Sequence, residues 1–192
     1  MRRARITKCF GVKGYAGGEN LCHKWVDFKE NRNVAIAGLA FLPLLGSKLD
    51  INPRPRIFLT NKEKLNAQSL WSGKGKRIKK IILAPGGGFK EKCWGDENFT
   101  RLCKLLLEEK SNRICLIGSD EDRSRIQINN NERVLNLCGT IDLRQSAAMV
   151  SEADFIISNS SVCMHLAGAF KVPSLILLGA WYNSAKLHYK QW

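Results

Sequence analysis

The chain has 192 residues, 44% of them hydrophobic, enough for one well-packed domain or one domain and part of another. No apolar run reaches the roughly 18 residues of a membrane-spanning helix. The formal net charge of +14 favours anionic partners such as a phospholipid surface, a phosphorylated glycolipid or nucleic acid, or else indicates a basic surface without a partner. The seven cysteines form no Cys-x-x-Cys pair, which predicts reduced thiols, a cytoplasmic location and no metal site.

The positive charge is concentrated in the first part of the chain. Residues 1–80 contain 18 Lys and Arg against 5 Asp and Glu, whereas residues 81–192 contain 13 against 12. We therefore expect the first part to contact an anionic membrane surface, on the inner face of the cytoplasmic membrane. The basic part has no known nucleic-acid-reading motif and no interleaved aromatic residues, so we expect no nucleic-acid partner.

The first part shows few regular elements. Residues 1–33 have no clear periodicity, and residues 34–45 predict a short buried helix. Two prolines in residues 52–56 exclude a helix there. Thr60 and Glu63 predict a capping box for a helix that runs to about Trp71.

A basic, glycine-containing linker follows over residues 72–80. We place the domain boundary in it, between a partial N-terminal region of residues 1–78 and a second domain of residues 79–192. In the second domain, short apolar runs alternate with segments of helical periodicity. The runs predict strands at residues 81–83, 114–117, 134–137, 155–157 and 175–178. The helices are expected at residues 96–107, with Asp96 as the cap, and at 121–128, 143–150 and 162–170.

This alternation predicts an α/β fold, a Rossmann-like, doubly wound parallel sheet. Ligands of such sheets bind beyond the carboxyl ends of the strands. The residues expected there are glycines, hydroxyls and carboxylates, at 86–88, 118–120, 139–140, 159–161 and 179–180. The helix that starts after Ser161 offers unpaired N–H groups to an anion, and His165 lies about one turn into it. This edge of the sheet therefore suits a nucleotide.

Three motifs in order resemble the bacterial heptosyltransferases of glycosyltransferase family 9. The first is the glycine-containing loop A-P-G-G-G-F-K-E-K-C-W at residues 84–94, and the second is N-L-C-G-T-I-D-L at residues 136–143. The third, residues 157–179, resembles the family's asparagine-aspartate-serine-glycine-proline-methionine-histidine signature. The resemblance covers roughly residues 79–180.

The resemblance implies the two-domain GT-B fold, with a nucleotide sugar, typically ADP-heptose, in the carboxy-terminal domain. The other domain of the family holds a lipopolysaccharide acceptor. Lys92 would contact the donor diphosphate, with the backbone of Gly87 and Gly88 close to it. Asp120 (or Glu121) and Thr140 would lie near the adenosine. The diphosphate and sugar end would be lined by Ser160, Ser161, Met164 and His165. No cofactor other than the nucleotide sugar and no metal is implied, because a lysine and a helix N-terminus can neutralise a leaving diphosphate.

The chain departs from the family pattern in two respects. Where the family signature has an aspartate and a glycine, this chain has Ser160 and Val162. The first 78 residues match no complete acceptor domain, so we expect a chain truncated at both ends that lacks the general base; the catalytic residues are unknown. Two other hypotheses stay open: a binding-only nucleotide-sugar domain, inactive without an acceptor domain, and a basic nucleic-acid binder.

Overall fold

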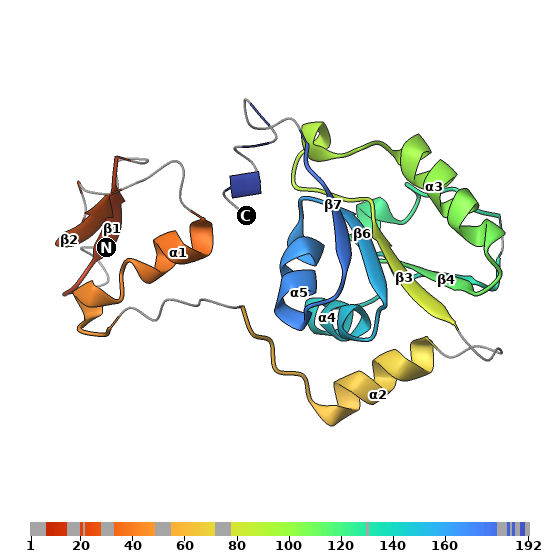
Figure 1. The fold of residues 1–192 in the computed structure, drawn as a ribbon, viewed down its shortest axis with the longest axis horizontal. Coiled ribbons are helices and arrows are strands. Elements are labelled where there is room, and N and C mark those ends of the chain that lie inside the picture. The colour runs from red at the N-terminus through yellow and green to blue at the C-terminus, as the bar shows by residue number, and fades with distance from the viewer. Residues whose placement is uncertain are drawn as a thin grey trace. The chain divides into compact units, whose positions relative to one another are not determined.

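The computed structural model describes residues 7–14, 20, 22–27, 33–48, 55–71, 78–129, 131–179, 184, 186 and 189–190 (Figure 1). Two compact units make up the chain: residues 1–53 with 182–192, and residues 54–181. Among the described residues, none of the helices combines the length and the apolar character needed to cross a bilayer.

The first unit contains two short parallel strands, β1 (Phe10–Lys13) and β2 (Lys24–Asp27), in a region where the sequence showed no periodicity. The predicted single buried helix over residues 34–45 is wrong. Helix α1 (Val34–Leu39) ends early, and a separate 3-10 turn, η3 (Pro43–Leu45), follows it. Pro43 has no N–H to continue a helix, and Leu45 is largely exposed.

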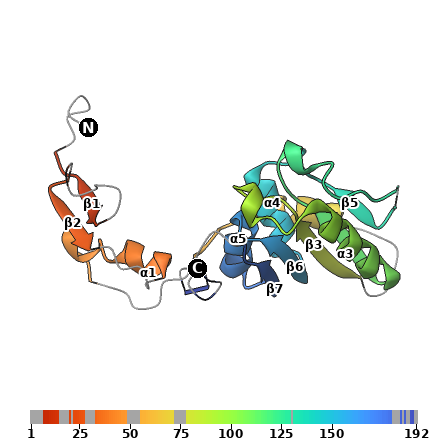
Figure 2. The ribbon, with the colours of Figure 1, turned by 90° about the horizontal axis from the view of Figure 1, so that it is seen from above.

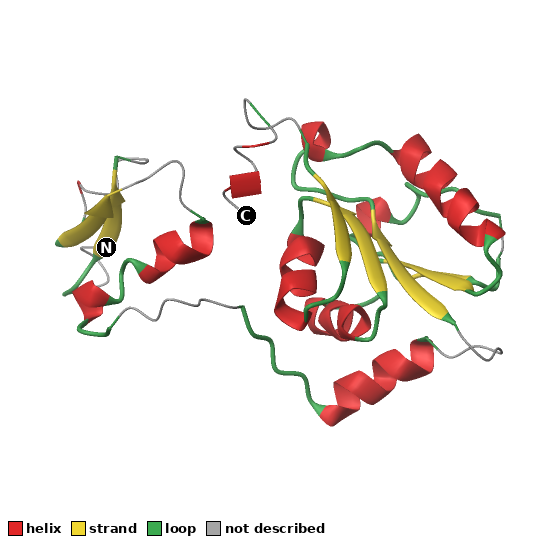
Figure 3. Cartoon of the chain, viewed as in Figure 1, coloured by secondary structure: helices red, strands yellow, loops and turns green. Residues whose placement is uncertain are grey.

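The second unit is built on a five-stranded parallel sheet with the order β5-β4-β3-β6-β7, which confirms the doubly wound sheet predicted from the sequence. The edge strands β5 and β7 lie at opposite sides of the sheet (Figure 2). The strands are β3 (Lys79–Ala84), β4 (Asn112–Leu116), β5 (Val134–Asn136), β6 (Phe155–Asn159) and β7 (Ser174–Leu177). The helices between them are α3 (Asp96–Glu108), α4 (Leu143–Ser151) and α5 (Val162–Phe170). Figure 3 shows this alternation of strands and helices along the chain.

Apolar side chains cover both faces of the sheet, as expected for a buried parallel sheet. On β3, Ile82 packs into the cluster formed with α4 and α5, whereas its neighbours Ile81 and Leu83 pack with α3. Successive residues of a strand point to opposite faces, so one strand serves both cores.

Helix α2 (Asn61–Leu70) packs on α4 and belongs to the second unit. The predicted capping box between Thr60 and Glu63 is present. Trp71 is buried, and its ring N–H donates to the carbonyl oxygen of Met149 at 3.3 Å. The compact unit therefore begins at Arg54, earlier than the boundary placed at residues 72–80.

Two local expectations about the second unit are wrong. The helix expected over residues 121–128 is only a 3-10 turn, η5 (Asp120–Asp122), which begins with a capping box between Ser119 and Asp122. Asp96 is the first residue of α3 and not its cap; that position belongs to Gly95, with φ of 106°.

Candidate functional site

A cavity of about 440 Å³ lies at the carboxyl ends of the strands, where the strand order reverses between β3 and β6. At this point the connections leave the neighbouring strands in opposite directions, which opens a crevice in doubly wound sheets. The cavity is lined by Ala84, Gly86, Gly87, Gly88, Ile117, Gly118, Ser119, Asp122, Ile141, Leu143, Ser146, Ser161, Val162 and Cys163.

One wall of the cavity consists of backbone. Gly86 and Gly87 follow β3, in a loop that also includes Gly88. A Cβ atom added to Gly88 would have no other atom within 4 Å. The N-terminus of α5 faces the cavity through Ser161, whose side chain makes no capping hydrogen bond to the helix. Unpaired N–H groups of a helix N-terminus favour an anion at this wall.

The buried carboxylate of Asp122 forms another part of the lining. Its oxygens accept hydrogen bonds from the Ser119 N–H at 2.8 Å and from the Arg125 Nε at 2.6 Å. A Cβ atom on Gly86 or Gly118 would overlap this carboxylate, so a larger residue at either position would have to displace it. Arg125 also pairs with Asp96 at 3.0 Å, which ties the carboxylate to the start of α3.

The remaining wall is apolar. Ile117, Ile141 and Leu143 line it, and Leu143 is mostly exposed at the start of α4. Cys163 also lines the cavity, but burial raises the pKa of its thiol to about 12. The thiol is therefore protonated near neutral pH and unsuited to act as a nucleophile.

Three of the residues expected at the site, Gly87, Gly88 and Ser161, line this cavity together. Lys92 does not line it. It lies in a 3-10 turn, η4 (Lys90–Lys92), with its ammonium group 5.2 Å from the centre of the Phe89 ring. Gly179, after β7, packs against the Lys92 backbone so closely that a Cβ atom would not fit.

The other expected residues are not part of the cavity lining. Asp120 is exposed and pairs with Arg123 at 3.3 Å, while the Thr140 hydroxyl donates to the Leu137 carbonyl oxygen at 2.9 Å. Two more of these expected residues, the half-buried Met164 and the exposed His165, lie in α5. Ser160 is half-buried in the turn before α5.

Two buried polar residues near the cavity were not recognised as individual contributors from the sequence. Asp122 stood within a charged segment predicted to be helical, so nothing local marked it as buried. Asn159 was expected in the turn after its strand, but it is the fully buried last residue of β6. Its side chain contacts the loop that carries the glycines, at Pro85, Gly86 and Trp94.

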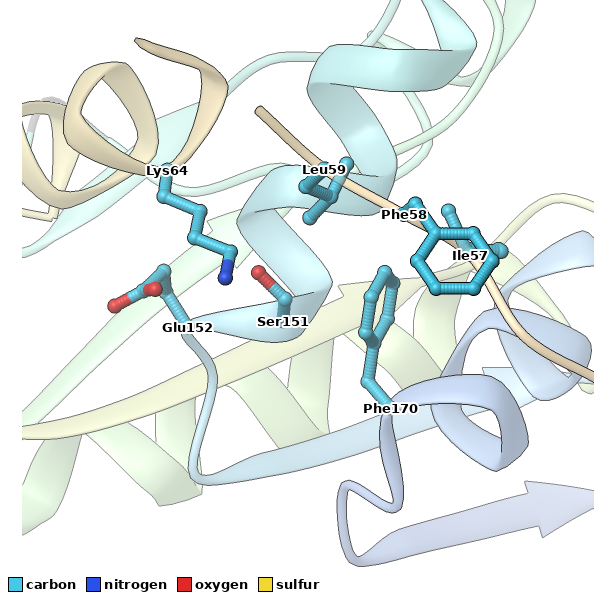
Figure 4. A pocket seen from close by; sticks show the side chains of 7 residues that line it. All are labelled: Ile57, Phe58, Leu59, Lys64, Ser151, Glu152 and Phe170. Atoms are coloured by element: carbon cyan, nitrogen blue, oxygen red, sulfur yellow. The ribbon is translucent and has the colours of Figure 1, made fainter. Parts of the chain in front are cut away.

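A second cavity, of about 350 Å³, lies away from this edge (Figure 4). Ser151 at the end of α4 and Phe170 at the end of α5 line it, so it lies near the starts of the strands. Figure 4 shows Lys64 directed toward Ser151 and Glu152. Within the described ranges, His, Cys, Asp and Glu side chains form no group of three that could hold a metal ion.

The strand order and the glycine-lined crevice at the reversal point define a Rossmann-like α/β domain. The sequence model of glycosyltransferase family 9 (heptosyltransferase) matches residues 40–184, and the chain belongs to this family.

Individual relatives agree with this assignment. The lipooligosaccharide heptosyltransferase 2 of Haemophilus ducreyi is 32% identical over 101 residues, which are 48% of this chain and 29% of the relative. The E. coli ADP-heptose lipopolysaccharide heptosyltransferase II shares the fold with a TM-score of 0.67 and 22% identity, over 90% of this chain and 56% of that one. A family 9 glycosyltransferase from Veillonella parvula gives a TM-score of 0.72 and 18% identity, over 91% of this chain and 51% of that one. The chain thus spans about half the length of these solved relatives, and less of the curated one.

Proposed function

We propose that this chain supplies the donor-binding half of a heptosyltransferase, which transfers heptose from ADP-heptose to a lipopolysaccharide core acceptor. The cavity at the reversal point carries this proposal, because it combines a glycine backbone wall with the N-terminus of α5. In this proposal the diphosphate lies between Gly86–Gly88 and Ser161, and no cofactor besides the nucleotide sugar takes part.

The two remaining walls fit the nucleoside end of such a donor. The apolar side chains of Ile117, Ile141 and Leu143 offer a surface for a flat base. The Asp122 carboxylate lines the same cavity and offers acceptor oxygens to the ribose hydroxyls. Lys92, in the same loop as the glycines, adds positive charge for the leaving diphosphate.

Calorimetry on the full chain tests the donor class. We expect ADP and ADP-heptose to bind more tightly than UDP or GDP, because the similar E. coli protein is an ADP-heptose lipopolysaccharide heptosyltransferase. Leu143→Asp, which places a charge on the apolar wall without touching the glycine loop, should weaken ADP binding. Tighter binding of UDP than of ADP would contradict the proposed donor.

We further propose that the basic first part of the chain brings the enzyme to the inner face of the cytoplasmic membrane, where its anionic glycolipid acceptor is found. Residues 1–80 carry 18 basic residues against 5 acidic ones. Each basic residue near an anionic surface contributes about 1 kcal/mol at most, and salt screens the attraction. Flotation with anionic liposomes should show binding that is lost in high salt, whereas binding that persists would indicate an apolar anchor.

A further inference from the structure

Asn159 joins both ends of the loop that carries the glycines and Lys92. Its side-chain amide N–H groups donate to the carbonyl oxygens of Pro85 at 2.6 Å and Gly86 at 3.3 Å. Its side-chain oxygen accepts a hydrogen bond from the backbone N–H of Trp94 at 3.1 Å. The side chain is fully buried, with 0% of its surface exposed.

These contacts occur where the sheet can no longer satisfy the backbone. β3 ends at Ala84, so the next carbonyl groups have no partner strand along the ladder. An unpaired buried polar group costs about 1–3 kcal/mol. Asparagine is suited to this place because it carries donors and an acceptor in one rigid amide, and the loop presents two carbonyl groups and one N–H.

The remaining loop contacts fix its position against the sheet. The Trp94 ring packs edge-to-face on Phe99 of α3, with ring centres 5.5 Å apart. A Cβ atom on Gly87 would lie 3.9 Å from the Cβ of Asn159, so the glycine wall passes directly over this residue. Asn159 is followed by Ser160 and Ser161, which lead into α5. One short segment therefore holds the glycine loop and also begins the helix that faces it.

We infer that Asn159 is a positioning residue, which sets the loop of residues 85–94 opposite the N-terminus of α5 and thereby sets the affinity for a diphosphate. This inference rests on the proposed function, in which the loop and the helix hold the donor diphosphate. Asn159 does not line the cavity, so it acts through the loop and not through contact with the ligand.

The test replaces the donor groups of Asn159 with nearly unchanged shape. In Asn159→Asp a carboxylate faces the carbonyl oxygens of Pro85 and Gly86, while an oxygen remains for the Trp94 N–H. Asn112→Asp is the matched control. Asn112 is also a buried strand asparagine, and its amide donates to the Leu106 carbonyl oxygen at 2.7 Å, but it lies at the start of β4, away from the loop.

Two measurements on the full chain separate positioning from general stability. Hydrogen–deuterium exchange should accelerate in peptides covering residues 85–94 in Asn159→Asp and not in Asn112→Asp. The affinity for ADP should fall about tenfold in Asn159→Asp while the affinity for adenosine stays unchanged. Should Asn159→Asp fail to fold, Asn159→Ser keeps one hydroxyl donor and should give the same pattern in weaker form.

Unchanged exchange in the loop, or an equal loss of ADP and adenosine binding, would overturn the inference. The same loop effect in Asn112→Asp would also overturn it. Wild-type protein that binds ADP no better than adenosine contradicts the proposed function; in that case the exchange measurement alone decides whether Asn159 holds the loop.

Discussion

The Asp122 carboxylate leaves little room for a side chain at two glycine positions in the cavity lining. Gly86 after β3 and Gly118 after β4 both face this carboxylate, and neither has a positive φ. Their requirement for glycine is therefore steric. Gly88, two residues after Gly86 in the same loop, has open space around its Cα atom.

Gly86→Ala should lower the free energy of unfolding by about 1–3 kcal/mol, because the added methyl group displaces the Asp122 carboxylate from its hydrogen bonds. Gly88→Ala serves as the control and should leave stability nearly unchanged. Urea unfolding of both variants measures the difference. Equal stability of the two variants would show that the Asp122 side chain can move aside.

Lys92 has a contact that distinguishes it from its neighbour Lys90. Lys92 is half-buried and leans on the Phe89 ring, whereas Lys90 is exposed. If Lys92 neutralises the donor diphosphate, Lys92→Ala should weaken ADP binding by about 1.5–3 kcal/mol, the range of a hydrogen bond to a charged group.

The same calorimetry on Lys90→Ala should show little change, and neither substitution should lower the melting temperature appreciably. An equal loss in both variants would indicate a diffuse effect of charge. If neither loses affinity, the phosphate lies at the N-terminus of α5, and Ser161→Ala becomes the substitution that weakens binding.

At the scale of elements, the attachment of α2 to α4 depends on residues far apart in the sequence. Arg144 of α4 pairs with Glu63 of α2 and donates to the Phe58 carbonyl oxygen at 2.9 Å. The hydrogen bond from Arg144, followed by those from Thr60, lowers the pKa of the Glu63 carboxyl from 4.5 to about 2.

A carboxyl whose pKa is lowered by folding stabilises the fold above its unfolded pKa and loses this contribution as the pH falls through its folded pKa. The stability difference between wild type and Glu63→Gln should therefore be largest above about pH 4.5 and shrink toward pH 2. Urea midpoints measured at several pH values provide the comparison. A difference that does not change with pH would mean that the charge of Glu63 contributes nothing.

At the scale of the whole molecule, the compact unit of residues 54–181 includes α2. Ala67 and Trp71 are buried in the same apolar cluster as Ala147 and Val150 of α4. Removal of α2 would expose this face of the core to water.

A fragment of residues 54–181 should unfold cooperatively, whereas a fragment of residues 78–181 should be less stable by about 3 kcal/mol or more, the cost of losing a large buried aromatic side chain. Denaturant unfolding of the two fragments measures the difference. Equal stability would favour a boundary within residues 72–80. Trp71→Ala in the longer fragment is the matched control and should reproduce most of the loss.

Much of the second unit could be predicted from the sequence because its signals are local. Short apolar runs such as 81–83 and 155–157 are too short for helices and favour buried strands, and their alternation with amphipathic segments favours a parallel sheet. The motif residues Gly87, Gly88 and Ser161 could likewise be placed at one edge, because the carboxyl ends of parallel strands meet there.

Only the tertiary structure decided which side chains complete that edge. Asn159 bonds to Pro85 across 74 residues and to Trp94 across 65, and Glu63 pairs with Arg144 across 81. Asp122 becomes buried because β3 and β4 end side by side, which brings Gly86 and Gly118 to the same carboxylate. Such partners have no periodic spacing in the chain, since they meet only after the sheet has formed. The sequence by itself thus determined the order of the elements and the edge at which the cavity lies, while the folded sheet decided which buried polar groups hold that edge in place.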